Sequence, residues 1–320
     1  MDCDPDVTPP RVVCLDTVMI DFALIIDALP PRGGDALSSR RLVTAGGGFN
    51  LMSAARRQGV DAQYVGQLGV GRFAEIARDV LAHEGIDIVL PPRGDLDLGV
   101  CVVLVDATGE RTFVTSPGAE LTIRAEDLDT LELGRGDVVY VSGYNVVYPE
   151  VADTVSGWLA GLSSEVVVAF DPGPRGADID PAVLARVLAR TDWLLCNAAE
   201  ARLLSGLDDV EQCARLLHER WRLARVVVRD GAQGCVGVTE GGAVRAPGFA
   251  TVVLDTNGAG DVHNGVVIAE LVRGTSGEEA LMRANAAAAI AISSFGPATC
   301  PGRDEVDTLL ASQPREVTRL

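Results

Sequence analysis

The residues with the most direct chemical meaning form one short segment, Asp255-Thr-Asn-Gly-Ala-Gly-Asp261, which an apolar, helix-like run at 262–271 follows at once. Two glycines in three positions before a helix leave backbone N–H groups able to converge on an anion, and the helix dipole adds partial positive charge there. Asp261 places a carboxylate beside this cradle. Such a group is useful where it takes a proton from a nucleophile that attacks a bound phosphate. The segment therefore indicates phosphoryl transfer; the alternative is a glycine-rich turn with an ordinary acid in the first helical turn.

A second glycine-rich segment lies far away near the N-terminus. It reads Gly46-Gly-Gly-Phe-Asn50 and precedes a helix-like run at 51–58. Together the two segments resemble the motifs of the ribokinase-like (PfkB) carbohydrate and nucleoside kinases. That family has a Gly-Gly pair with an Asn at the head of a helix, and later the pattern Asp-Thr-x-Gly-Ala-Gly-Asp. Two independent motifs in the expected order are hard to produce by chance.

The resemblance extends over nearly the whole chain, from about residue 11 to 310, and implies its fold. It implies an α/β protein with a mainly parallel central sheet flanked by helices and a small β-sheet lid. We expect one kinase domain at 11–312, with lid segments at about 17–44 and 98–116. Residues 1–10, which are acidic and rich in proline, are expected to be a disordered tail.

The local patterns agree with this fold. Short apolar strands are predicted at 138–141, 166–170, 193–196, 226–228 and 235–238, with helices between them at 181–189 and 210–221. Apolar strands without alternation that are separated by helices indicate a parallel sheet covered on both faces. Further helical patterns are predicted at 51–58, 262–271 and 279–293, and candidate lid strands at 11–15, 18–29, 37–44, 99–105 and 111–115.

The implied activity is that of an ATP-dependent kinase that phosphorylates a primary hydroxyl of a sugar or sugar derivative. Asp261 would be the general base that takes the proton from the acceptor hydroxyl. The N–H groups of Gly258, Ala259 and Gly260 would hold the charge that develops on the transferred phosphoryl group. Glycine suits this place because a side chain would block close approach of the backbone.

The acceptor side is assigned in the same way. By the resemblance, Asp21 binds the sugar hydroxyls from the first lid segment, and Gly47 and Asn50 add hydrogen bonds to them. Carboxylate and amide groups suit polyols because they accept from and donate to adjacent hydroxyls. Asp16 and Asp35 are alternatives to Asp21, each also readable as a strand-end or turn residue.

The nucleotide side involves residues at strand ends. By the resemblance, Asn197, Arg229, Gly231 and Asn285 contact ATP, and Glu200 holds Mg²⁺ through water. Asn197 and Glu200 are equally the pattern of a helix N-cap with a capping box. Asn285 is otherwise a buried, satisfied amide within an Ala-rich helix.

Activation by a monovalent cation such as K⁺ is common in the family. Asp255, Asn257 and backbone carbonyls at 294–300 would be its ligands here. Asn257 stands where Thr is usual, and Cys300 is atypical.

Other departures concern the acceptor. The family's Gly-Asp-Asp is replaced by Gly69-Val-Gly71. Ribokinases proper carry a Glu where this chain reads Ser142-Gly-Tyr-Asn145, which argues against D-ribose. Tyr144 could stack on a ring or a base, so a nucleoside acceptor stays open. His263 is expected to be a packed histidine rather than a substrate ligand.

Composition excludes several other mechanisms. All 27 basic residues are arginine, so the Walker A loop, protein kinases and Schiff-base enzymes, which require lysine, are excluded. The chain has only three histidines, which argues against a metal site with three His ligands. A net charge of −18 argues against binding nucleic acid or an anionic membrane surface. The pattern at Gly66-x-x-Gly69-x-Gly71 is reversed relative to a dinucleotide-binding loop, which argues against an NAD-dependent oxidoreductase.

The remaining expectations concern location and assembly. The chain has no apolar run of the roughly 18–20 residues that a membrane span needs, and no signal or transit peptide pattern. Its seven cysteines form no paired or metal-binding pattern, which suggests a reducing, cytoplasmic setting. The resemblance implies a homodimer that pairs through the lid. A non-catalytic sugar- or nucleotide-binding regulator of the same fold is the alternative function of a different class.

Overall fold

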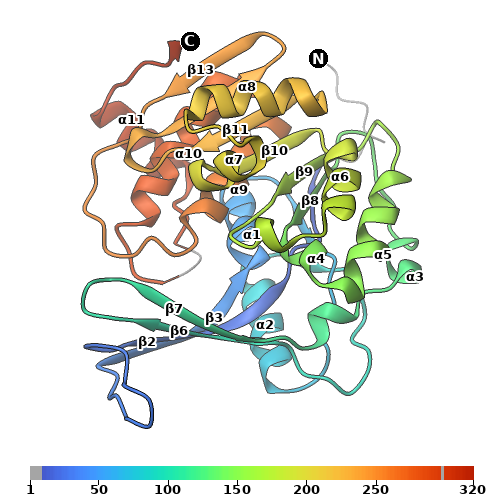
Figure 1. Cartoon of the computed structure of the whole chain (residues 1–320), viewed down its shortest axis with the longest axis vertical. Coiled ribbons are helices and arrows are strands. Elements are labelled where there is room, and N and C mark those ends of the chain that lie inside the picture. Colours follow the sequence, from blue (N-terminus) through green and yellow to red (C-terminus); the bar gives the residue numbers. More distant parts are fainter. Residues whose placement is uncertain (1–8, 297–298) are drawn as a thin grey trace.

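A ten-stranded sheet runs through the body of the protein in the computed structural model, which describes residues 9–296 and 299–320 (Figure 1). The strand order is β14-β13-β12-β11-β10-β9-β8-β1-β4-β5. The strands from β11 to β5 are parallel, and β12, β13 and β14 add an antiparallel edge. The strand bounds are β1 Val12–Cys14, β4 Ala62–Tyr64, β5 Asp87–Ile88, β8 Val138–Ser142, β9 Val167–Asp171, β10 Trp193–Asn197, β11 Arg225–Arg229, β12 Cys235–Thr239, β13 Gly242–Ala246 and β14 Thr318–Arg319.

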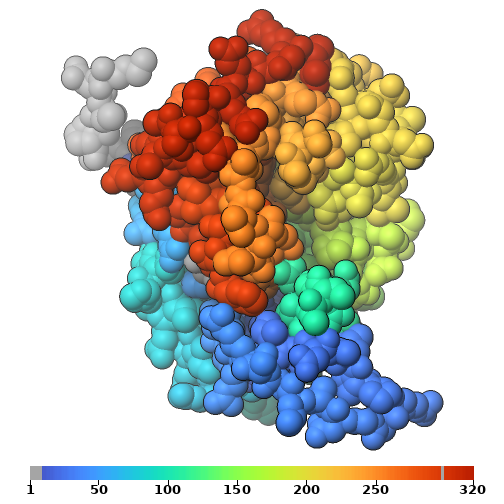
Figure 2. All heavy atoms as spheres, turned by 90° about the vertical axis from the view of Figure 1, so that its left-hand side faces the viewer, coloured from blue at the N-terminus to red at the C-terminus, as the bar shows by residue number. Residues whose placement is uncertain are grey.

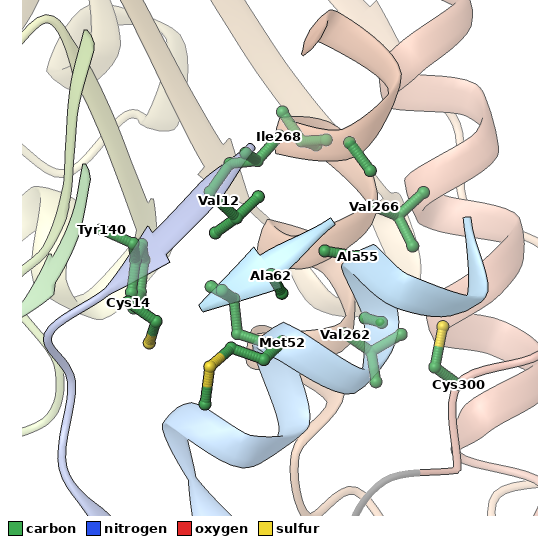
Figure 3. Close-up of a cluster of buried hydrophobic side chains, with 14 of the residues drawn as sticks. Val12, Cys14, Met52, Ala55, Ala62, Tyr140, Val262, Val266, Ile268 and Cys300 are labelled. Atoms are coloured by element: carbon green, nitrogen blue, oxygen red, sulfur yellow. The ribbon is translucent and has the colours of Figure 1, made fainter. Parts of the chain in front are cut away.

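Helices cover both faces of this sheet, as the continuous apolar strands predict. Val12 and Cys14 of β1 belong to one hydrophobic cluster, and Val13 and Leu15 belong to another on the opposite face. Figure 3 shows part of the first cluster, where side chains of β1 and β4 meet those of α1 and α9. The helix bounds are α1 Gly48–Arg57, α2 Arg72–His83, α3 Ala125–Leu128, α4 Tyr144–Val147, α5 Pro149–Ala160, α6 Pro181–Arg190, α7 Ala198–Ser205, α8 Val210–Trp221, α9 Ala259–Val272, α10 Gly277–Ala291 and α11 Arg303–Ser312.

A separate four-stranded sheet projects from the body and forms the lid (Figure 1). Its order is β3-β2-β6-β7, with bounds β2 Val18–Ile25, β3 Arg40–Gly47, β6 Val100–Val105 and β7 Arg111–Ser116. The strand predicted at 37–44 corresponds to β3, which begins and ends three residues later in the chain. It ends later because Val18 pairs with Gly47, so that the hairpin extends to the first glycine motif. The strand predicted at 11–15 belongs to the body as β1.

The chain thus has the ribokinase-like α/β architecture, with a small lid sheet beside a large, mostly parallel one. The parallel strands and the helices α6, α8, α9 and α10 lie where the sequence predicts them, with shifts of a few residues at the ends. Among the helices of the described residues, none is both long and apolar enough to cross a membrane. The expectation of a disordered tail at 1–10 falls mainly on residues 1–8, which lie outside the described residues.

Candidate active site

Polar residues stand at the carboxyl ends of successive parallel strands. Asp16 follows β1, and Ser142, Asp171, Asn197 and Arg229 are the last residues of β8, β9, β10 and β11. Because parallel strands all end at one edge of the sheet, these side chains come together there, where ligands bind in open α/β sheets.

The predicted anion cradle lies at this edge, at the start of α9. Gly258 precedes the helix with φ of 72°, a left-handed conformation that favours glycine. A Cβ on Gly258 would lie 3.2 Å from Asn50 Nδ2, and one on Gly260 would lie 3.5 Å from Arg229 Cζ. The N–H groups of the first helical turn have no partners within the helix, and Ala259 N makes only a long contact of 3.3 Å with the carbonyl of Thr256 in the preceding loop, so this turn can receive an anion.

Asp261 is held at the rim of this cradle by the second motif. Asn50 Nδ2, on α1, donates to Asp261 Oδ2 at 3.0 Å. Burial raises the pKa of Asp261 to about 6; the nearby Asp171 adds to the rise, and the Asn50 hydrogen bond opposes it. The structure therefore brings the two predicted motifs into direct contact.

The residues predicted to bind the acceptor lie on the lid side of Asp261. Burial and the charge of Asp261 raise the pKa of Asp21 to about 7, opposed by the side chain of Asn257. Gly47 has φ of 63°, and a Cβ there would lie 2.2 Å from the carbonyl oxygen of Thr17, so only glycine fits between the lid and α1. Asp21, Gly47 and Asn50 thus come together around one place.

Asp16, an alternative to Asp21, also belongs to this group, whereas Asp35 does not. Asp16 is buried, and its Oδ1 accepts from Thr17 N at 2.8 Å and from the hydroxyl of Ser142. Burial raises its pKa to about 7, with further contributions from Asp261 and Asp171. Asp35 is exposed in the β2–β3 loop.

A cleft of about 730 Å³ opens on the other side of the cradle. All four residues assigned to the nucleotide line it, together with two residues of the cradle and His263: Asn197, Arg229, Gly231, Asn285, Ala259, Gly260 and His263. The structure places the four together although they come from four different segments of the chain.

Arg229 is embedded in a polar network beneath the cradle. Its guanidinium donates to Asp171 Oδ2 at 3.0 Å and to Asn264 Oδ1, and lies 3.7 Å from Glu200 Oε2. Asn264 also donates to Asp171 Oδ2 at 2.7 Å. Burial opposes ionisation of Arg229, but the Asp171 and Glu200 carboxylates raise its pKa above the ordinary value. A permanent positive charge therefore lies directly behind Gly260.

Asn197 and Glu200 form the capping box that was the structural alternative for them. Glu200 N donates to Asn197 Oδ1 at 2.9 Å, and Asn197 N donates to Glu200 Oε2 at 2.7 Å. Burial and the Asp171 charge raise the pKa of Glu200 to about 7. Among the described residues no cluster of three or more His, Cys, Asp or Glu side chains could cage a metal ion.

Asn285 and His263 are packed against each other, as expected for His263 and as the alternative for Asn285 predicts. His263 Nε2 lies 3.1 Å from Asn285 Oδ1, and Asn285 Nδ2 donates to the carbonyl of Ala246 at 3.0 Å. Burial lowers the pKa of His263 to about 3, so this histidine is neutral. Both residues still border the cleft.

Asp255 and Asn257 lie in the loop before the cradle. Asn257 N donates to Asp255 Oδ1 at 2.8 Å, and Gly296 N donates to Asp255 Oδ2 at 3.0 Å. Arg111 of the lid also donates to Asp255 Oδ1. Of the carbonyls expected at 294–300, those of residues 297 and 298 lie outside the described residues.

The site includes residues that sequence reasoning missed. Asp171, Asn264 and Arg111 each contact a predicted site residue. The position of Asp171, at the end of an apolar strand, was a usable signal. Arg111 had none, because its partner is 144 residues away.

Comparison with known proteins identifies the class. Residues 9–303 match the pfkB family carbohydrate kinase domain. The chain is 32% identical over 307 residues to an uncharacterized sugar kinase, YegV, of Escherichia coli, covering 93% of this chain and 95% of that one. It is 29% identical to an ATP-dependent ribose-1-phosphate kinase of Halopiger xanaduensis (95% and 99% covered). It is 27% identical to an aminoimidazole riboside kinase of Salmonella typhimurium (90% and 92% covered).

The solved structures agree with this class. The ribokinase of Thermotoga maritima superimposes with a TM-score of 0.80 at 25% identity, with 95% of this chain and 100% of that chain covered. The chain therefore belongs to the pfkB family of carbohydrate kinases. It is a phosphotransferase with an alcohol group as acceptor, within a family of sugar and nucleoside kinases that use ATP.

Proposed function

We propose that this protein transfers the γ-phosphate of ATP to a primary hydroxyl of a sugar or sugar derivative. The observation that carries the proposal is the position of Asp261 in the first turn of α9, where it is hydrogen-bonded to Asn50 and lies near Asp16 and Asp21. Ala259 and Gly260 of the same turn line the nucleotide cleft, so an acceptor hydroxyl bound near Asp21 and Asp16 would approach a phosphate held at this turn.

In this proposal Asp261 takes the proton of the acceptor hydroxyl as its oxygen attacks the γ-phosphate. A base is most effective when its pKa is near the working pH, and about 6 meets that condition. The N–H groups of Gly258, Ala259 and Gly260 would bind the phosphoryl oxygens, and Arg229 would add positive charge from behind Gly260.

Mg²⁺ would enter with the nucleotide and neutralise charge on its phosphates. Both oxygens of Glu200 already accept from Asn197, which favours contact of Asn197 and Glu200 with such an ion through its water shell. This suits Mg²⁺, which keeps several waters and is bound mainly by substrate phosphates.

A nucleoside is the second candidate acceptor, and Tyr144 favours it. This side chain is half-buried among Asp16, Asp261 and Cys101, and burial raises its pKa to about 12. A tyrosine ring in that position could stack on a base or a sugar ring. A panel of sugars, sugar phosphates and nucleosides, followed by ADP release, separates these candidates.

The decisive variant is Asp261→Asn, which keeps the size of the side chain and one oxygen that can accept from Asn50 but cannot act as a base. We expect turnover to fall by about 10²–10⁴-fold while ADP binding, measured by calorimetry, is unchanged. Asp35→Asn, at an exposed lid residue, is the matched control. Unchanged turnover in Asp261→Asn would remove this residue from the mechanism, and binding of ligands without any turnover in the wild type would favour a non-catalytic regulator.

The proposal includes cytoplasmic location and a homodimer formed through the lid. The six cysteines of the described residues are all free and buried, which suits a reducing compartment. Cell fractionation tests the location, and the dimer is tested below.

A further inference from the structure

An arginine of the lid reaches across to the loop that carries the anion cradle. Arg111, the first residue of β7, donates to Asp255 Oδ1 and, at 2.9 Å, to Thr256 Oγ1. The side chains of Arg111 and Asp255 are only 17% and 10% exposed. Figure 2 shows this face of the molecule, with the green β6–β7 turn of the lid close to the orange segment that precedes α9.

A second arginine of the lid reinforces this contact. Arg40 and Arg111 occupy one row of the lid sheet, because Ile25 pairs with Arg40 and Val105, and Val105 pairs with Arg111. Arg40 lies 4.9 Å from the centre of the Phe295 ring, next to Gly296. The end of the lid sheet farther from α1 therefore presents two positive charges to the two segments around Asp255.

Both oxygens of the Asp255 carboxylate accept hydrogen bonds from these neighbours. Oδ1 accepts from Asn257 N and Arg111, and Oδ2 accepts from Gly296 N. Asp255, Thr256 and Asn257 lead directly into Gly258, so the conformation of the cradle depends on what holds this carboxylate.

The residues at Asp255 do not fit a bound monovalent cation. Burial lowers the pKa of Arg111, but the guanidinium group of arginine is not deprotonated in proteins, so Arg111 carries a positive charge. Two positive charges about 4 Å apart repel each other by about 4 kcal/mol at an effective dielectric constant of 20. A cation bound to Asp255 would have to displace Arg111 from its acceptor.

We infer that Arg111 supplies, from the lid, the positive charge that fixes the anion-cradle loop, so that phosphoryl transfer by this protein needs no added monovalent cation. The inference rests on the proposed function, since it assigns a role to the same cradle. Arg111 acts through Asp255 and is a positioning residue. It also couples lid closure to the order of the cradle, because only the docked lid brings the guanidinium to Asp255.

The first test measures rates of the full-length enzyme in choline, sodium and potassium chloride at matched ionic strength. We expect the same kcat in all three salts. Arg111→Ala should lower kcat by about 10–100-fold with a smaller effect on KM, because the loop is misplaced. Guanidinium or K⁺ should restore part of that loss. Arg32→Ala, at an exposed arginine of the β2–β3 loop, should behave as the wild type.

A second readout does not need an acceptor. The melting temperature of the ADP-bound wild type should be equal in potassium and choline chloride, whereas that of Arg111→Ala should rise with K⁺. A saturable rise of the wild-type kcat or melting temperature with K⁺, or an Arg111→Ala variant equal to the wild type, would overturn the inference. If no acceptor is phosphorylated at all, the proposed function fails, and the melting temperatures still decide the role of Arg111.

Discussion

At the scale of single residues, the site concentrates carboxyl groups that are costly to ionise. The charge of Asp261 acts on both Asp16 and Asp21, and burial raises the pKa of each of the three carboxyl groups. A pKa raised in the folded state weakens folding at high pH, because the folded protein must give up protons that it binds more tightly than the unfolded chain does. In the proposed function, this loss of stability accompanies an acceptor site whose base, Asp261, has a suitable pKa.

The rate should depend on the protonation of Asp261. Because its pKa is about 6, we expect kcat/KM to be constant above neutral pH and to fall tenfold per pH unit well below 6, as the base becomes protonated. A pH–rate profile measures this. If the fall in kcat/KM at low pH is unchanged in Asp261→Asn, another group is responsible for it.

Stability should depend on the charge of Asp16. The pKa of Asp16 is about 7 in the folded state against an ordinary value of 3.8. Ionisation of Asp16 therefore does not weaken folding below pH 4, weakens it increasingly as pH rises, and has its full effect above pH 7. Asp16→Asn keeps the acceptor for Thr17 and Ser142. We expect it to raise the free energy of unfolding at pH 8 by on the order of 1–4 kcal/mol, and the gain to shrink towards pH 4. Urea denaturation measures this, and a gain independent of pH would contradict the assignment.

At the scale of elements, the hydrogen bond between Asn50 and Asp261 depends on how closely two helices approach. α1 carries Asn50 and α9 carries Asp261, and the helices touch at Gly265. A Cβ on Gly265 would lie 2.5 Å from the carbonyl oxygen of Leu51 and 2.7 Å from Ala54 Cβ. The glycine therefore permits the approach that sets the Asn50–Asp261 distance.

Gly265→Ala should separate α1 from α9. We expect a loss of stability of about 1–3 kcal/mol from overpacking and a lower kcat from the displaced base. In Gly157→Ala, on α5, the added Cβ meets no atom within 4 Å, so this control should be neutral or stabilised by about 0.5–1 kcal/mol. Thermal melts and initial rates measure the stability and kcat of both variants. If Gly265→Ala equals Gly157→Ala in both quantities, the α1–α9 contact is not tight.

At the scale of the whole molecule, the lid has two open edges, β3 and β7. It also exposes apolar side chains in one row of the sheet, where Val43 is 39% and Val114 is 60% exposed. Unpaired strand edges and exposed apolar residues favour pairing with another chain. This surface is the physical basis for a lid-mediated homodimer.

We predict that the protein is a dimer at micromolar concentration, which analytical sedimentation measures. Val114→Glu should shift it to the monomer, because burying an unpaired charge in an interface is costly. Leu203→Glu, at an exposed residue of α7 away from the lid, should leave the dimer intact. A monomeric wild type would remove the lid dimer from the proposal.

Much of the protein follows from local sequence patterns. The helix α8 was predicted at its observed bounds, and the apolar strands identified the parallel sheet, because burial on both faces requires continuous apolar residues. The cradle and Asp261 could be assigned because glycines before a helix and an acid in its first turn have a chemical meaning without any tertiary contact.

The contacts that make these parts one site were decided by the tertiary structure. Asn50 and Asp261 are 211 residues apart, Arg111 and Asp255 are 144 apart, and Arg229 and Asp171 are 58 apart. Such pairs depend on the order of strands in the sheet and on the docking of the lid, which no local pattern encodes. For this reason the sequence by itself determined which groups are candidates for the chemistry, and only the tertiary structure placed an arginine of the lid against Asp255.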